Sequence, residues 1–79
     1  MKIYQALIFN NIWKFYESNL SIKELYKMLN EKDFYIEINV ETKKEIIYNV
    51  SSIKTIEECD LEKCSIESSG YEISIIEFI

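Results

Sequence analysis

The feature that most constrains this chain is an alternation of apolar and polar residues between positions 34 and 50. The run FYIEINV places every second side chain on one face, namely Phe34, Ile36, Ile38 and Val40. After a polar TKK the same period resumes with Ile46, Tyr48 and Val50. A period of two is typical of strands, and two such runs joined by a short polar segment predict an antiparallel β-hairpin.

The segment LSIKELYKMLNEK, which precedes this hairpin, has a helical period instead. Ser21 and Glu24 have the spacing of a capping box, in which each side chain bonds the backbone N–H of the other residue. Leu20 and Leu25 occupy the positions of a hydrophobic staple around that cap. The segment therefore predicts a helix over residues 22–31.

The two ends of the chain are less regular. Residues 2–8 predict a strand, and a helical wheel sorts the following residues into one apolar arc, so we expect a helix over about 10–18. A single longer helix is the alternative. Aromatic side chains at helical spacing are expected in the core: Phe9, Trp13, Phe15, Tyr16 and Tyr26. The C-terminal CSIESSGYEISIIEFI predicts a second hairpin that turns at Ser69 and Gly70, where glycine supplies a positive φ.

These elements together predict an α+β fold. We expect one small domain over residues 1–79, in which two helices from the N-terminal half lie on a mainly antiparallel sheet of four to five strands.

The residue types that are missing exclude much chemistry. The chain has no histidine and no arginine, and Gly70 is its single glycine. Histidine is the commonest general base, arginine reads phosphates and guanines with two hydrogen bonds, and glycine-rich loops hold phosphates. We therefore expect a protein that is not an enzyme and has no cofactor. The abundance of Ile, Lys, Asn and Tyr indicates AT-rich codons, as in a low-GC bacterium, its phage or its plasmid.

Cys59 and Cys64 do not form a recognisable metal or redox motif. Two cysteines without histidine are too few for a structural zinc site, and their spacing is not that of a redox pair. An EF-hand loop that starts at Asp60 would place Ser65 at the glycine position and Tyr71 where a bidentate glutamate belongs. We therefore predict no metal site, and we expect both cysteines to be reduced and buried as small hydrophobic residues.

The apolar runs are short. None approaches the roughly 20 residues that a membrane-spanning helix needs, and no small-residue cleavage site follows the N-terminal apolar run. We therefore expect a cytoplasmic protein that does not bind a membrane.

The net charge of −5 is carried by one segment. Residues 57–72 contain six acids and one lysine, which equals the excess of the whole chain. Direct binding of nucleic acid is not expected, because phosphate contacts need cations. The segment instead predicts a partner-binding acidic patch made of Glu57, Glu58, Asp60, Glu62, Glu67 and Glu72. Residues 55–64 fit either a helix or an extended segment, and a solvated connector is the alternative to a binding surface.

An acidic patch on a small domain can steer that domain onto a basic groove and occupy it. We therefore expect a partner that is a host protein with a basic, nucleic-acid-binding groove. The hypothesis is a phage- or mobile-element-encoded inhibitor, of the anti-CRISPR or another anti-defence type, that mimics nucleic acid. The alternatives are an antitoxin or other regulatory partner of a toxin, and a structural or assembly subunit of a phage. The broad apolar arc over residues 10–18 also leaves room for a homodimer contact.

Overall fold

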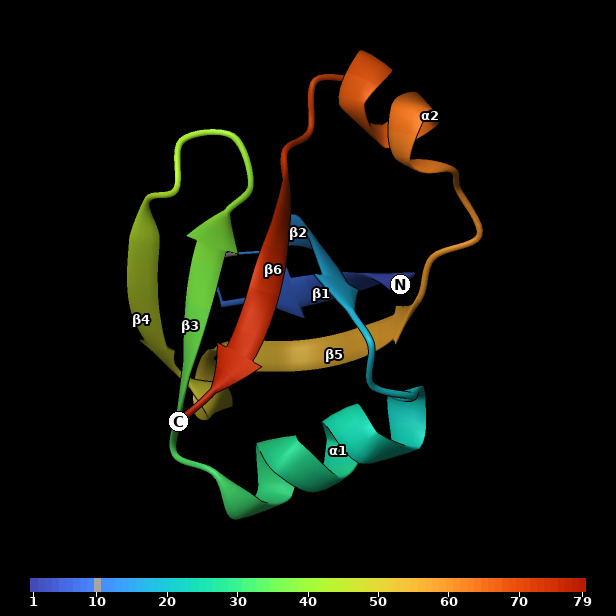
Figure 1. Cartoon of the computed structure of the whole chain (residues 1–79). Helices are drawn as coiled ribbons and strands as arrows, with labels where there is room; N and C mark the ends of the chain where they lie inside the picture. Colours follow the sequence, from blue (N-terminus) through green and yellow to red (C-terminus); the bar gives the residue numbers. More distant parts are fainter. Residues whose placement is uncertain (10) are drawn as a thin grey trace.

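A computed structural model of the chain describes residues 1–9 and 11–79, which form six strands, two α-helices and one 3₁₀ turn (Figure 1). In chain order they are β1 (Lys2–Ile8), β2 (Ile12–Ser18), α1 (Ile22–Glu31), β3 (Phe34–Asn39), β4 (Glu45–Asn49), η1 (Val50–Ser52), β5 (Ile53–Glu58), α2 (Lys63–Ser68) and β6 (Ile73–Phe78). The α+β prediction is confirmed. The predicted strand count of four to five is too low, and one of the two helices lies in the C-terminal half.

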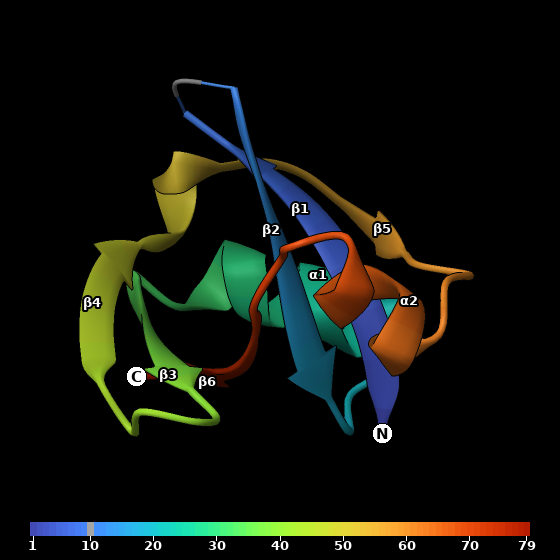
Figure 2. The ribbon, with the colours of Figure 1, turned by 90° about the horizontal axis from the view of Figure 1, so that it is seen from above.

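All six strands belong to one sheet with the order β4-β3-β6-β2-β1-β5. Neighbouring strands are antiparallel except for β2 and β6, which are parallel. Strands β1 and β5 run across the direction of β3, β4 and β6, so the sheet is strongly curved (Figure 1). β4 and β5 form its two edges, as the view from above also shows (Figure 2).

The helix predicted over residues 10–18 is wrong, because these residues form β2. β2 pairs with β1 along its whole length, from Ile8 opposite Ile12 to Lys2 opposite Ser18. Asn10, at which the predicted helix starts, lies outside the described residues. β2 is covered on both faces, with Tyr16 packed on the α1 side and Phe15 on the α2 side. A strand that is buried on both faces has consecutive apolar residues, which is why it resembles a helical arc. Phe9, Trp13 and Tyr26 are exposed rather than buried.

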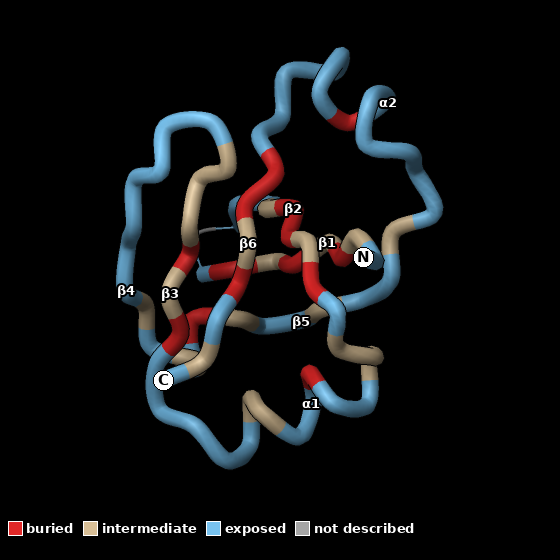
Figure 3. Tube along the Cα trace, viewed as in Figure 1, coloured by how far each residue is buried: buried red, intermediate tan, exposed pale blue. Residues whose placement is uncertain are grey.

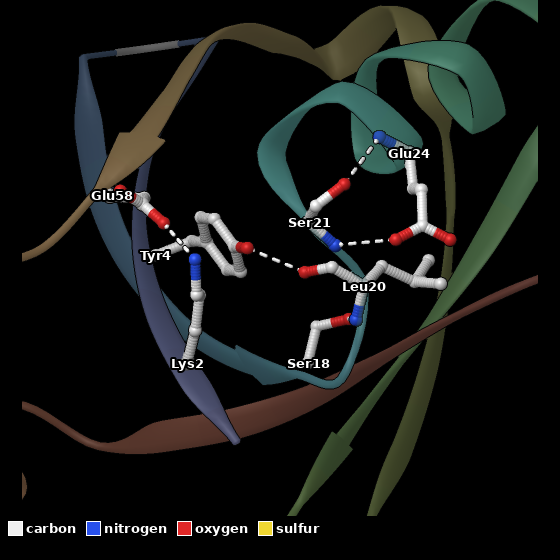
Figure 4. A network of polar contacts seen from close by, with 7 residues as sticks. All are labelled: Lys2, Tyr4, Ser18, Leu20, Ser21, Glu24 and Glu58. Atoms are coloured by element: carbon white, nitrogen blue, oxygen red, sulfur yellow. Dashed lines mark hydrogen bonds and ion pairs between the residues drawn. The ribbon is translucent and has the colours of Figure 1, made fainter.

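Helix α1 has the predicted bounds and the predicted cap. Ser21 Oγ accepts a hydrogen bond from the backbone N–H of Glu24 at 3.2 Å, and Glu24 Oε1 accepts one from the N–H of Ser21 at 3.0 Å (Figure 4). The hydrogen bond from the Ser21 N–H to the Glu24 carboxylate, with a further contribution from the Ser21 hydroxyl, lowers the pKa of Glu24 below its ordinary value. Leu25 is fully buried, and Leu20 packs against the same core cluster, as a staple requires.

The β3–β4 hairpin is also confirmed, with Phe34 opposite Asn49 and Ile38 opposite Glu45. The buried residues of β3 are Tyr35 and Glu37, which lie between the apolar residues of the alternating pattern. Tyr35 stacks on Tyr48 of β4 and contacts Phe78 of β6, so aromatic side chains fill this side of the sheet.

The second hairpin predicted at Ser69 and Gly70 is wrong. Residues 63–68 form α2, and the positive φ of Gly70 ends that helix instead of turning a hairpin. The N–H of Gly70 donates to the carbonyl of Glu67 and that of Tyr71 to the carbonyl of Ile66, which is the hydrogen-bond pattern of a Schellman cap. After this cap the chain enters β6 between β2 and β3.

Three tyrosines, Tyr4, Tyr16 and Tyr35, are fully buried on the α1 side, and burial raises the pKa of each. Figure 3 shows that the buried residues follow the central strands and one position of each helix. The hydroxyl of Tyr4 donates to the carbonyl of Leu20, and that of Tyr35 lies 3.3 Å from Ser52 Oγ. The Tyr16 hydroxyl has Tyr35 and Glu37 as polar neighbours but forms no hydrogen bond of ordinary length and angle with any described residue.

Because the hydroxyl of Tyr4 has a hydrogen-bond partner and that of Tyr16 does not among the described residues, replacing each with phenylalanine should change stability in opposite directions. A buried hydroxyl without a partner costs about 1 to 3 kcal/mol of desolvation, whereas a satisfied one contributes about 1 kcal/mol. We expect Tyr16→Phe to raise the free energy of unfolding by about 1 kcal/mol and Tyr4→Phe to lower it by about as much. Urea unfolding followed by circular dichroism measures both, and a loss of stability in Tyr16→Phe would contradict the assignment.

Candidate functional site

The six predicted site residues lie along the path from the end of β5 through α2 to the start of β6. All six are exposed: Glu57, Glu58, Asp60, Glu62, Glu67 and Glu72. Figure 3 shows this path as almost continuously exposed, with one buried position in α2, which is Ile66. Residues 55–64 are therefore extended up to Glu58 and helical from Lys63, with a loop between them. Ile66 fixes the helix to the sheet by packing against Phe15 and Ile73.

Glu57 and Glu58 are separated from the other acids by their place in β5. As neighbours in a strand they point to opposite faces of the sheet. Glu57 accepts a hydrogen bond from the side-chain amide of Gln5. Glu58 forms an ion pair with Lys2 at 2.8 Å (Figure 4), which neutralises it and raises the pKa of Lys2. These two residues therefore belong to the β1–β5 edge.

Glu62, Glu67 and Glu72 are brought together around α2. Glu62 and Glu67 line one shallow hollow beside Lys63 and Cys64. Glu67 and Glu72 line a second hollow of about 250 Å³ on the side of the β3–β4 turn. Glu41, which comes from that turn, lines the second hollow as well. We call Glu41, Glu62, Glu67 and Glu72, with Asp60 in the preceding loop, the acidic surface.

Lys63 lies within this surface and lines both hollows, but its ion pair is with Glu17 rather than with an acid of the surface. Lys63 Nζ lies 3.1 Å from Glu17 Oε1 on β2, and the side chain of Glu17 is only 14% exposed. The hydrogen bond to Glu17 and its charge raise the pKa of Lys63. In residues 1–9 and 11–79, no lysine lies within ion-pair distance of Asp60, Glu62, Glu67 or Glu72. The acidic surface therefore presents its charge to the solvent.

Sequence reasoning missed Glu41 because nothing local connects it to α2. Asn39 explains its position: Asn39 Oδ1 accepts from the N–H of Glu41 at 2.9 Å, and its amide donates to Glu72 at 2.9 Å. The β3–β4 turn is thus held against the segment that leads into β6. This contact depends on the position of β6 between β2 and β3, which no local pattern indicates.

The two cysteines are free and differ in environment. Cys59 is half-buried against the Phe15 cluster, whereas Cys64 is exposed on α2, so the prediction that both are buried is wrong for Cys64. The described part of the chain contains no group of three or more metal-ligating side chains placed to hold an ion. It also contains no helix that is long and apolar enough to cross a bilayer.

No protein-family model, curated protein or solved structure matches this chain.

Proposed function

We propose that this chain is a non-enzymatic protein-binding module that docks its acidic surface on a basic, nucleic-acid-binding surface of another protein. The observation that carries the proposal is the set of exposed acids at Asp60, Glu62, Glu67 and Glu72 on a folded helix and loop, none of which forms an ion pair with a lysine in residues 1–9 and 11–79. Such a surface accelerates encounter with a basic groove and rejects acidic surfaces.

The biological role that best fits such a module is inhibition. A protein that covers the groove of a nucleic-acid-binding enzyme prevents nucleic acid from entering it, and it needs no chemistry of its own. The AT-rich residue usage and the small size suit a phage or mobile element whose product acts on a host defence system, as an anti-CRISPR or another anti-defence protein does. The target is then a host protein that loses nucleic-acid binding when this chain is present.

Reversing the charge of the acidic surface tests the proposal. We expect the triple variant Asp60→Lys, Glu62→Lys, Glu67→Lys to retain at most about one tenth of the partner that the wild type captures from a lysate of its host, because like charges across an interface cost several kcal/mol. The control reverses three exposed acids elsewhere, Glu31, Glu45 and Glu77, and so has the same net charge.

The captured partner should bind nucleic acid, and duplex DNA or RNA should compete with this chain for it. Purified components then give the affinity and its salt dependence. A partner that the triple variant and the wild type bind equally well would overturn the acidic-surface mechanism. A partner that does not bind nucleic acid would overturn the inhibitory role.

A further inference from the structure

The chain has a second surface feature, which lies beside the acidic surface and is a gap in the sheet. β2 pairs with β1 from Ile12 onward but pairs with β6 only over Phe15–Glu17. β6 begins at Ile73, so the segment 12–14 has no neighbouring strand on that side among the described residues. A strand without a neighbour presents a row of backbone N–H and C=O groups that another chain can use.

A cleft of about 550 Å³ lies at this gap. One wall is the free segment of β2, a second is the Gly70–Glu72 segment, and the third is the end of β3 with the β3–β4 turn. Large apolar side chains line it although they are exposed: Ile12 (48%), Trp13 (42%), Ile46 (39%) and Tyr71 (48%). The cleft has the size of typical ligand sites, and its three free β2 residues span roughly 10 Å, the length of three residues of an added strand.

The two faces of the gap differ in chemistry. Trp13 alternates with Lys14 and so shares a face with Phe15, against which the ring of Tyr71 packs edge-on at 5.0 Å. On the other face, Lys14 forms an ion pair with Glu37 at 2.9 Å. A strand added here would contact aromatic rings with every second side chain and charged groups with the others.

The distribution of charge along the cleft indicates the occupant. Lys14 is neutralised by Glu37, and the other two charged side chains of the lining, Lys44 on the side of the β3–β4 turn and Glu72 on the Gly70–Glu72 wall, form no ion pair in the described part of the chain. The unpaired negative charge of the cleft therefore lies on its Gly70–Glu72 wall. The cleft shares its Gly70–Glu72 wall with the hollow that Glu41 and Glu67 line, so it continues into the acidic surface. We propose that the cleft binds an extended peptide segment in which apolar and basic residues alternate, and that this segment adds a strand beside Ile12–Lys14.

This inference rests on the proposed function, because it specifies which part of a basic partner protein the chain holds. Main-chain hydrogen bonds along β2 supply affinity, as in other cases of strand addition, and the alternation of side chains supplies specificity. Lysines of the peptide lie toward Glu72 and the acidic surface, and its apolar residues contact Trp13 and Tyr71.

Four synthetic peptides test the proposal without knowledge of the partner: acetyl-KIKVKI-amide, the acidic acetyl-EIEVEI-amide, and two versions of the basic peptide with N-methyl groups at alternate residues, one in each register. Trp13 is the only tryptophan of the chain, so its fluorescence reports occupancy, and ¹⁵N amide shifts at Ile12–Lys14 locate the site. We expect saturable binding of the basic peptide and binding at least about tenfold weaker for the acidic one and for one of the two N-methyl registers.

Two variants complete the test. Tyr71→Ser is expected to weaken the basic peptide about tenfold, whereas Leu61→Ser, at an exposed leucine outside the cleft, leaves it unchanged. Circular dichroism confirms that both variants are folded. The proposal is overturned if the basic peptide gives no saturable response, if the acidic peptide binds equally well, or if neither N-methyl register weakens binding. Failure here together with continued capture of a basic partner would place binding on the acidic surface alone, and peptide binding without such a partner would overturn only the proposed function.

Discussion

Replacing Lys14 with methionine is expected to lower the free energy of unfolding by about 3 to 5 kcal/mol. Lys14 on β2 reaches across β6 to Glu37 on β3 and contacts both carboxylate oxygens, at 2.9 and 3.0 Å. The side chain of Glu37 is only 8% exposed. Without Lys14 its carboxylate stays in a nearly dry environment with no cation, and an unpaired buried charge is much more costly than the pair is favourable.

The size of this effect is large for such a small domain. Proteins are stabilised by about 0.05 to 0.15 kcal/mol per residue, which gives roughly 4 to 12 kcal/mol for this chain. Burial opposes the charge of Lys14, but the hydrogen bond and the charge of Glu37 outweigh it and raise the pKa of Lys14. The ring of Tyr48, 5.5 Å from the ammonium, adds a cation–π contact. The Lys14→Met protein is therefore expected to be at the limit of folding.

A double variant and a matched control separate the charge from the loss of packing. Lys14→Met combined with Glu37→Leu removes both charges and should recover most of the lost stability, because apolar replacement of a buried pair is often neutral or better. Lys2→Met breaks the exposed pair with Glu58 and should change stability far less than Lys14→Met, because solvent screens an exposed pair. Urea unfolding measures all four proteins, and equal costs for Lys14→Met and Lys2→Met would contradict the burial argument.

The same ion pair lines the cleft in which we place a peptide. A buried pair is weak evidence for stability in itself, since hydrophobic residues of similar size often do as well. Its position on one face of the gap, opposite the aromatic rings at Trp13 and Tyr71, gives the two faces different preferences. We expect the Lys14→Met, Glu37→Leu protein to be folded. Its affinities for the basic and the acidic peptide therefore also show whether the charged face contributes to peptide selectivity.

The parts of the fold that sequence patterns could predict are those that local interactions determine. The cap of α1 needs only Ser21 and Glu24, and the β3–β4 hairpin needs only its alternation and a polar turn. The strand β2 could not be predicted in this way. Contacts with β1, α1 and α2 bury both of its faces, so its sequence does not show the alternation of apolar and polar residues that is typical of a strand. The prediction for the C-terminal segment was wrong for a related reason. A glycine with positive φ fits a helix C-terminus as well as a hairpin turn, and which of the two forms depends on the packing of Ile66 against the sheet.

The candidate site also has one part that the sequence could predict and one part that it could not. Composition alone located the excess charge at residues 57–72, and all six predicted acids are exposed. It could not show that Glu58 is neutralised by Lys2, that Lys63 is directed toward Glu17, or that Glu41 joins the surface. Each of these contacts joins segments distant in sequence, and two of them depend on where β6 enters the sheet. The cleft at β2 depends on the same placement of β6. The first residue of β6 pairs with Phe15, so the preceding residues of β2 extend beyond the start of β6 and leave the cleft.

Stability is expected to fall above pH 10, by about 1.4 kcal/mol per pH unit for each buried tyrosine that keeps its proton in the folded state, because of Tyr16 and Tyr35. Burial raises the pKa of both above 10.0, the ordinary value, so the folded protein keeps these protons. The unfolded chain loses them as the pH passes about 10. The unfolded state then binds fewer protons than the native state, so the free energy of unfolding decreases as pH rises, at about 1.4 kcal/mol per pH unit for each tyrosine.

Other groups act in the same direction. Burial also raises the pKa of Tyr4, although the nearby charge of Lys2 opposes that shift, and the pKa of Lys14 is raised as well. Below pH 10 the contribution of the tyrosines is constant, so the stability should show no dependence on them there. With a total of roughly 4 to 12 kcal/mol, this loss is a large fraction of the stability in strongly alkaline solution.

Urea unfolding at pH 9, 10 and 11 measures the slope, and Tyr16→Phe should reduce it by about 1.4 kcal/mol per pH unit. Absorbance at 295 nm provides a second reading, because buried tyrosines form tyrosinate only when the protein unfolds. The ionisation of Tyr16 should therefore coincide with the loss of the circular dichroism signal. If stability at pH 11 equals that at pH 9, or if Tyr16→Phe leaves the slope unchanged, the aromatic side chains under α1 are accessible to solvent and the tyrosine core described here is incorrect.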